Sequence, residues 1–166
     1  MITSLYTAND NLYYTTSKYG IAAFLYEYKN GTETKLELPY PSGEIVLESP
    51  SKESLMLQVG IDGWTHDYTR YLFMDNAFTI DPLSNHKNYP EFKDIEVNEV
   101  LVTSHDGVEV PLSIISKKGM PYDGSNPTFI YTYGAYGDSI TPFFSPVFLN
   151  WVRLGGVLVI PHIRGG

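Results

Sequence analysis

Two histidine–aspartate pairs, His66-Asp67 and His105-Asp106, carry side chains that could serve as a general base beside an orienting carboxylate. Neighbouring side chains on a strand point to opposite faces, and Asp106-Gly107 is typical of a hairpin turn. We therefore expect neither pair to be catalytic. The 166 residues also contain no Gly-x-Ser-x-Gly sequence, the usual signature of a nucleophilic serine on a tight strand-to-helix turn.

The remaining acids and histidines form no recognisable ligand set. The four histidines lack His-Glu-x-x-His or similar spacing, so no metal site is predicted. The absence of cysteine excludes disulfides, thiolate zinc sites and a cysteine nucleophile, and it leaves the redox compartment open. Glu44, Glu48 and Asp75 keep a carboxylate-based glycosidase open as an alternative, because the sequence does not encode their separation.

Composition sets the outer limits of function. With 43% hydrophobic and 18% charged residues, the chain has the composition of an ordinary soluble globular protein. A net charge of -8, with 11 basic residues among 19 acids, argues against nucleic-acid binding, which needs clustered Lys and Arg. No apolar run reaches the 18 or so residues of a membrane span. The compartment, cytoplasmic or periplasmic, stays undetermined.

Residues 1–93 are predicted to be all β. Asn30-Gly31 lies between two strand-like runs and is the strongest short-range hairpin signal; Asn30-Gly-Thr32 is also a glycosylation sequon, but the turn explains it without further assumptions. The last four of the predicted strands have the spacing of one propeller blade, so this region should hold one blade and most of another. The predicted strands are 12–16, 23–28, 34–38, 44–48, 54–59, 70–74 and 77–80.

The C-terminal forty residues have the pattern of a βαβ unit. Thr128–Tyr133 is rich in aromatic and β-branched residues, and Val157–Ile160 is an apolar run of the kind buried in a parallel sheet. Between them Ser145 is a good helix N-cap, Pro146 suits the first helical position and Gly155 is placed to end the helix.

These motifs resemble the start of the catalytic domain in the prolyl oligopeptidase family of serine peptidases. The family's aromatic-glycine signature after an apolar strand is similar to Tyr131-Thr-Tyr-Gly-Ala-Tyr-Gly137. Its second signature is similar to Gly155-Gly-Val-Leu-Val-Ile-Pro-His-Ile-Arg-Gly-Gly166, and its entry hairpin to residues 104–112, 117–119 and 123–127. Several linked motifs in order, over roughly residues 97–166, are far more specific than one short pattern.

The resemblance implies a two-domain serine peptidase in which a β-propeller covers an α/β-hydrolase domain. Residues 1–93 would be the C-terminal blades of the propeller, and residues 94–166 the first part of the hydrolase domain. The chain would then be a fragment of a longer polypeptide that hydrolyses short peptides by acyl transfer without a cofactor. The nucleophile, acid and histidine would all lie downstream, so this chain alone is expected to be inactive.

The resemblance also assigns site residues. Tyr133 matches the tyrosine whose hydroxyl helps to hold the tetrahedral oxyanion; the alternative is a buried tyrosine bonded to a backbone carbonyl. Tyr136 stands where many members carry a phenylalanine that lines the first specificity pocket, the alternative being a loop aromatic packed at the domain interface. Arg164 is expected to be structural, holding loop carbonyls or a carboxylate.

Residue preference and function class stay open at this point. Gly134-Ala-Tyr-Gly137 and His162 are nearer to the dibasic-specific oligopeptidase B branch than to the prolyl-specific pattern. A propeller-type binding module without catalysis is the second function class, because the chain has 14 tyrosines, eight phenylalanines and two tryptophans. Period-2 placement in strands favours core and cross-strand pairs for most of these rings instead.

Overall fold

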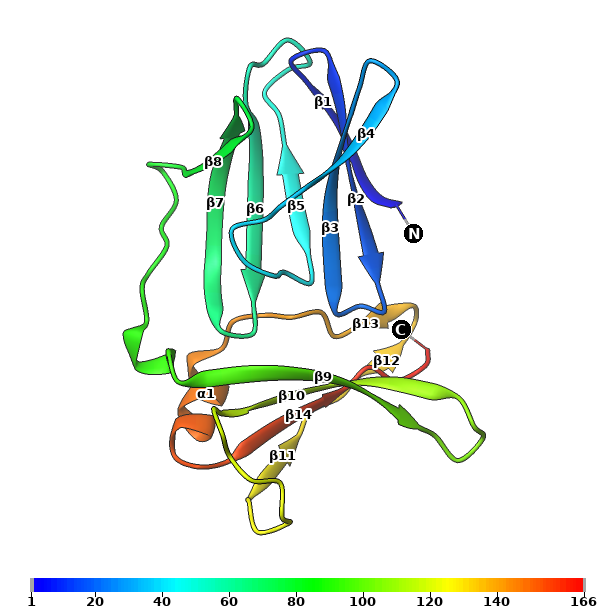
Figure 1. Ribbon diagram of the computed structural model, residues 1–166, viewed down its shortest axis with the longest axis vertical. Helices are drawn as coiled ribbons and strands as arrows, with labels where there is room; N and C mark the ends of the chain where they lie inside the picture. The colour runs from blue at the N-terminus through cyan, green and yellow to red at the C-terminus, as the bar shows by residue number, and fades with distance from the viewer. Residues whose placement is uncertain (1, 166) are drawn as a thin grey trace. The chain divides into compact units, whose positions relative to one another are not determined.

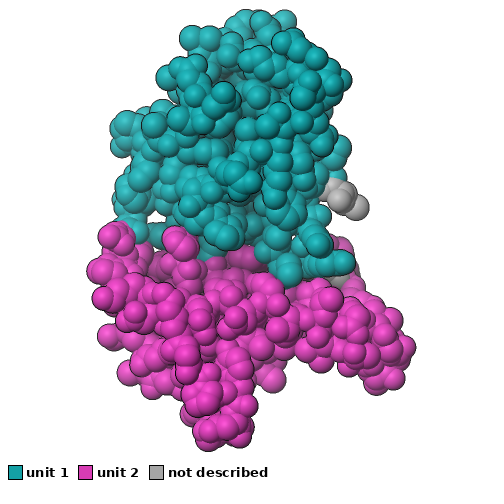
Figure 2. All heavy atoms as spheres, viewed as in Figure 1, with its two compact units in different colours: residues 1–63, 67–87 teal, residues 64–66, 88–166 magenta. Residues whose placement is uncertain are grey.

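The computed structural model describes residues 2–165 and divides into two compact units (Figures 1 and 2). Unit 1 comprises residues 1–63 and 67–87, and unit 2 comprises residues 64–66 and 88–166. The proposed domain division at residues 93 and 94 stays a prediction. Each unit has its own apolar core, so each is described separately.

Unit 1 is built from two four-stranded antiparallel sheets in which neighbouring strands follow the order of the sequence. The first sheet contains β1 (Ile2–Ala8), β2 (Asn11–Lys18), β3 (Ala22–Lys29) and β4 (Thr32–Leu36). The second contains β5 (Ile45–Glu48), β6 (Leu57–Gly63), β7 (His66–Met74) and β8 (Ala77–Ile80). His66, at the start of β7, groups with unit 2.

The prediction of one complete and one incomplete set of strands is wrong, because β1 completes the first sheet. Most of β1 is exposed, including Ile2 and Leu5, so it lacks the apolar alternation of a half-buried strand. β1 is held in the sheet by backbone pairing with β2 from Ile2 to Ala8. A strand held by pairing rather than by burial gives only a weak sequence signal.

The hairpin predicted at Asn30-Gly31 is confirmed. Both residues have positive φ, 49° and 80°, and β3 and β4 pair antiparallel on either side of them. Two consecutive residues of positive φ make the turn whose twist matches that of the flanking strands. The alternating inward side chains of both sheets meet in one core, whose fully buried members include Leu25, Leu57, Val59 and Ile61.

Unit 2 is organised around a mixed four-stranded sheet in the order β11-β14-β10-β9 (Figure 1). A short 3₁₀ helix, η1 (Pro90–Phe92), precedes β9 (Ile95–Thr103) and β10 (Glu109–Lys117), which form an antiparallel hairpin with the predicted turn at Asp106-Gly107. β14 (Val157–Pro161) pairs antiparallel with β10 and parallel with β11 (Thr128–Ile130). Gly134–Ala135 (β12) and Asp138–Ser139 (β13) form a small second hairpin.

The predicted βαβ unit is confirmed. The side chain of Ser145 accepts from the Phe148 N–H at the start of α1 (Pro146–Arg153), and Gly155 follows the helix with a φ of 102°. Leu149 and Val152 of α1 are buried in the unit 2 core. The predicted strand to Tyr133 is too long: β11 ends at Ile130, although the Tyr131 N–H still donates to the Val159 carbonyl.

Candidate functional site

Two glycine-bearing segments meet where the parallel strands β11 and β14 end. A Cβ atom on Gly134 would lie 2.6 Å from Ile163 Cγ1 and 2.9 Å from the Ile163 carbonyl oxygen. A Cβ atom on Gly165 would lie 2.6 Å from the Gly134 carbonyl oxygen. Only glycine permits so close an approach of two backbones. The carboxyl ends of parallel strands are also where ligands bind in open α/β sheets.

Hydrogen bonds fix these two segments to each other. Thr132 Oγ1 donates to the Pro161 carbonyl at 2.8 Å, and the Gly137 N–H donates to the Gly165 carbonyl at 3.0 Å. The bonds lie on either side of the Gly134 contact, so the turn of residues 132–137 rests on residues 161–165 at several points.

Tyr133 lies on this turn with its side chain 47% exposed. None of the hydrogen bonds within residues 2–165 uses its hydroxyl. Within residues 2–165, Tyr133 therefore lacks the backbone-carbonyl partner that the alternative of a buried tyrosine supposes.

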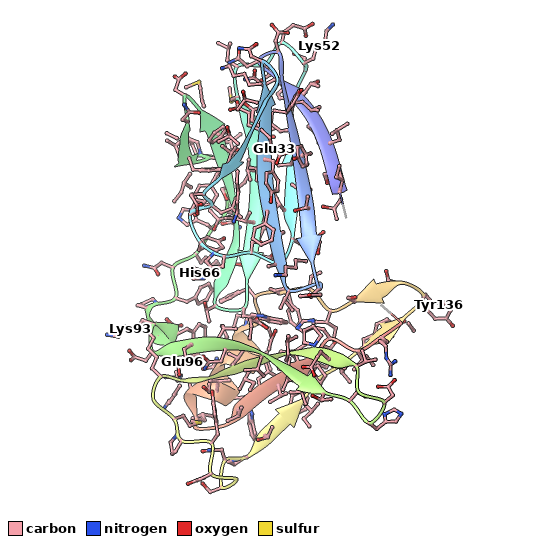
Figure 3. All side chains as sticks on the ribbon, turned by 45° about the vertical axis from the view of Figure 1, so that its right-hand side comes forward. Glu33, Lys52, His66, Lys93, Glu96 and Tyr136 are labelled. Atoms are coloured by element: carbon pink, nitrogen blue, oxygen red, sulfur yellow. The ribbon has the colours of Figure 1, made fainter. Side chains whose placement is uncertain are left out.

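Tyr136 occupies the tip of the β12–β13 hairpin. It and Gly137 have φ values of 58° and 81°, so a non-glycine residue adopts the left-handed region at the first turn position. Its side chain is 97% exposed, and Figure 3 shows it pointing outward from the hairpin. The substrate-binding assignment of Tyr136 stays a prediction, as does that of Tyr133.

Arg164 pairs with a carboxylate, one of the two structural roles expected for it. Arg164 Nη1 lies 2.7 Å from Asp106 Oδ2, which joins the segment after β14 to the turn of the β9–β10 hairpin. Hydrogen bonding to Arg164 holds the pKa of Asp106 below its ordinary value. Asp106 is thus engaged by Arg164, while the ring of its neighbour His105 lies 3.3 Å from Ser104 Oγ.

The sequence did not predict a buried cluster of three polar side chains, Ser113, Glu99 and His162. Ser113 on β10 lies 2.7 Å from Glu99 Oε2 on β9 and 2.8 Å from His162 Nε2 after β14. The serine lies between the acid and the histidine, whereas a catalytic triad places the histidine in the middle. Ser113 is also fully buried, so it is not a nucleophile within this unit. Periodicity marks Ser113 as an inward position on β10, but no pattern links it to His162.

The other predicted features agree with a structural use of most aromatic rings. Tyr14 and Tyr26 face each other across β2 and β3 and stack with centroids 5.1 Å apart, and Tyr13 makes an edge contact with Phe73.

Residues 2–165 contain no cluster of three metal-ligating side chains. No helix within that range is long and apolar enough to span a membrane.

No family model matches the chain, but individual known proteins are similar to it. It is 46% identical over 68 residues to a prolyl endopeptidase of Elizabethkingia miricola, which covers 41% of this chain and 10% of the relative. It is 31% identical over 135 residues to an uncharacterised peptidase, y4nA, of Sinorhizobium fredii strain NBRC 101917 / NGR234, which covers 80% of this chain and 18% of the relative.

A solved structure extends the likeness over the whole chain. Prolyl oligopeptidase B from Galerina marginata, bound to a 35mer hydrolysis and macrocyclization substrate, superposes with a TM-score of 0.84 at 23% identity. The match covers 99% of this chain and 24% of that one. The chain belongs to the prolyl oligopeptidase family of serine peptidases. It spans about a quarter of the length of the solved relative, and its fold is mostly β with four-stranded antiparallel sheets.

Proposed function

We propose that this chain is part of a longer serine peptidase that hydrolyses short peptides by acyl transfer. In that protein unit 1 would contribute two blades of a β-propeller, and residues 94–166 would begin the α/β-hydrolase domain. The propeller would limit access to small substrates. The 46% identity to a prolyl endopeptidase and the confirmed βαβ unit support this proposal.

Within that peptidase, Tyr133 would donate a hydrogen bond to the oxyanion of the tetrahedral intermediate. The observation that carries this role is its position: Tyr133 lies just past the carboxyl end of β11, on a turn held by backbone contacts, with a hydroxyl unused within residues 2–165. A pre-aimed neutral donor stabilises developing negative charge without reorganising during the reaction. Tyr136, exposed on the next turn, would lie on the substrate side.

The nucleophile, acid and base are expected downstream of residue 166. The first test is to read the coding sequence past this point: a Gly-x-Ser-x-Gly motif within roughly the next hundred residues, followed by Asp and His, supports the proposal. Purified chain of residues 1–166 should give no turnover of fluorogenic peptides above buffer, since it lacks the serine motif. Turnover by that chain would contradict the proposal.

The second test replaces Tyr133 with phenylalanine in the complete polypeptide. Losing one oxyanion donor should lower kcat/KM by about a hundredfold or more, on the order of 3 kcal/mol, while Tm stays nearly unchanged because the ring is kept. Tyr131→Phe is the matched control, since Tyr131 lies two residues earlier and is also partly exposed. Equal kcat/KM for Tyr133→Phe and wild type would reject the oxyanion role.

A further inference from the structure

The segment that follows β14 has two different sides. The carbonyl of Pro161, the last residue of β14, accepts from Thr132 of the turn that carries Tyr133, and Ile163 and the Arg164 carbonyl lie against Gly134 of that turn. The side chains of His162 and Arg164 instead contact the β9–β10 hairpin: His162 lies against Ser113, and Arg164 pairs with Asp106. The segment therefore lies between the Tyr133 turn and the hairpin.

The two anchors to the hairpin differ in burial. The Arg164 and Asp106 side chains are 59% and 34% exposed, so solvent weakens that ion pair. His162 is 7% exposed and Ser113 is fully buried, so their contact is shielded from water. The backbone N–H of His162 adds a bond of 2.9 Å to the Pro111 carbonyl. His162 is the stronger of the two anchors.

Hydrogen-bond counting assigns the roles in the buried contact. A serine hydroxyl has one proton, and that of Ser113 goes to Glu99 Oε2. With Glu99 ionised, Ser113 Oγ accepts from the N–H at His162 Nε2. Nδ1 is buried without a hydrogen-bond partner among residues 2–165. Burial also lowers the pKa of His162, which favours the neutral form.

We propose that His162 is a positioning residue for Tyr133: Ser113 and Glu99 hold its imidazole, and the segment 161–165 thereby supports the turn from which the Tyr133 hydroxyl is aimed. This inference rests on the proposed oxyanion role of Tyr133. His162 itself contacts no substrate. Its effect is transmitted through the backbone contacts of Ile163 and Gly165 with Gly134.

A double-mutant cycle in the complete polypeptide tests the proposal. Ser113→Ala removes the acceptor of the His162 N–H and should lower kcat/KM by about tenfold, because small misplacement of a catalytic group is costly. In the Tyr133→Phe background the same substitution should change kcat/KM less than about twofold, since it acts through the lost hydroxyl. Ser116→Ala is the matched control: Ser116 is a fully buried serine on the same strand, bonded instead to Tyr122 at 2.9 Å. It should leave kcat/KM within about twofold of wild type.

Rescue by side-chain chemistry separates positioning from simple packing. His162→Gln keeps an N–H donor near the position of Nε2 and should retain most of the activity, whereas His162→Leu should lose about tenfold in kcat/KM at comparable Tm. Equal activity of the Gln and Leu variants, or an equal Ser113→Ala effect with and without Tyr133, would overturn the proposal. A Ser113→Ala variant as active as Ser116→Ala would overturn it as well.

An NMR measurement that does not depend on enzymatic activity distinguishes the positioning role of His162 from the oxyanion role of Tyr133. In ¹⁵N-labelled chain of residues 1–166, the His162 side chain should show the Nε2–H tautomer, and Ser113→Ala should shift the Gly134 and Gly165 amide signals while Ser116→Ala does not. If these shifts are seen but Tyr133→Phe leaves kcat/KM unchanged, the oxyanion role fails and the coupling stands. If the Gly134 and Gly165 signals do not move, the positioning role fails even where Tyr133→Phe is inactive.

Discussion

The two units differ in how far along the chain their polar side chains find partners. In unit 1, Tyr13 donates to Glu27 across 14 residues of sequence, and Arg70 to Asp81 across 11. In unit 2, Ser113 meets His162 across 49 residues and Thr132 meets Pro161 across 29. Unit 1 also has longer contacts, such as the bond from Tyr40 Oη to the Ile61 carbonyl across 21 residues, but the side-chain bond between Ser113 and His162 in unit 2 spans more of the sequence.

Two arginine–aspartate pairs make the same contrast. Arg70 Nε lies 2.6 Å from Asp81 Oδ2, and only 5% of the Asp81 side chain is exposed. Arg164 and Asp106 are equally close but far more exposed. Asp81 has its pKa lowered by the Leu83 backbone N–H first and by Arg70 second. The pair in unit 1 therefore closes a local loop, while the pair in unit 2 adds a weak, solvent-screened anchor.

The comparison shows which contacts position the candidate site. Unit 1 is built from antiparallel hairpins and contains neither Tyr133 nor Tyr136. Unit 2 brings together the ends of β11 and β14 and the β9–β10 hairpin, and Tyr133 lies at that junction. Changes at the junction should therefore have larger effects than similar changes in unit 1.

The largest expected effect tests this contrast with two glycines. Gly134→Ala places a Cβ against the Ile163 and Arg164 carbonyls, at 2.9 and 3.1 Å, and backbone on both sides resists the displacement. It should destabilise unit 2 by about 2–3 kcal/mol, the range for overpacking. Gly60→Ala in unit 1 meets only the outer end of the Tyr68 ring, which is 45% exposed and free to turn away. It should cost less than about 1 kcal/mol, because alanine also favours the strand.

Amide hydrogen exchange measures the two units separately in one sample. Gly134→Ala should speed exchange in β14 and β10 and leave β2 and β6 unchanged. Gly60→Ala should leave both sets nearly as in wild type. Equal losses from the two substitutions would contradict the view that the junction in unit 2 is the less tolerant region.

Sequence reasoning succeeded where the signal was local. The Asn30-Gly31 turn, the Ser145 cap, Gly155 and the strand alternation of unit 1 each depend on a few adjacent residues. It missed β1, whose side chains are mostly exposed. It also missed the contact of Ser113 with His162, because no rule of spacing connects two residues joined only by the strand order β14-β10-β9. The site position of Tyr133 came from family resemblance and stays a prediction.

A smaller effect is expected at the part-buried hydrogen bond between Tyr13 and Glu27 in unit 1. Tyr13 Oη donates to Glu27 Oε1 at 2.8 Å, and Tyr13 is 5% exposed. Tyr13→Phe should lower stability by about 1.5 kcal/mol, since hydrogen bonds to charged groups contribute more than neutral ones. Amide exchange should show the loss only in β1–β4, because the bond joins the neighbouring strands β2 and β3. Tyr14→Phe is the control, because the Tyr14 hydroxyl donates to Glu33 at an exposed position, and it should have less effect.

Asp62 on β6 of unit 1 differs from these hydrogen-bonded groups, because its surroundings disfavour its charged form. Burial, and then the nearby charge of Glu44, raise its pKa from 3.8 to about 6. Asp106 in unit 2, by contrast, has a lowered pKa because Arg164 is its partner. A carboxyl group whose folded-state pKa is raised favours folding in its protonated form. The stability that Asp62 contributes is therefore present below about pH 3.8 and is lost as the pH rises through about 6.

The smallest expected effect is the pH-dependent gain from Asp62→Asn. At pH 7.5 the substitution removes an uncompensated charge and should raise the urea midpoint of unit 1. At pH 4 the wild-type carboxyl is already largely protonated, so the two midpoints should nearly coincide. Asp10→Asn, at an exposed turn, is the control for the same change of net charge, from -8 to -7, and should not give the gain expected of Asp62→Asn. A gain of equal size at both pH values would mean that Asp62 is not the group that titrates, and a loss at pH 7.5 would mean that its charge has a stabilising partner.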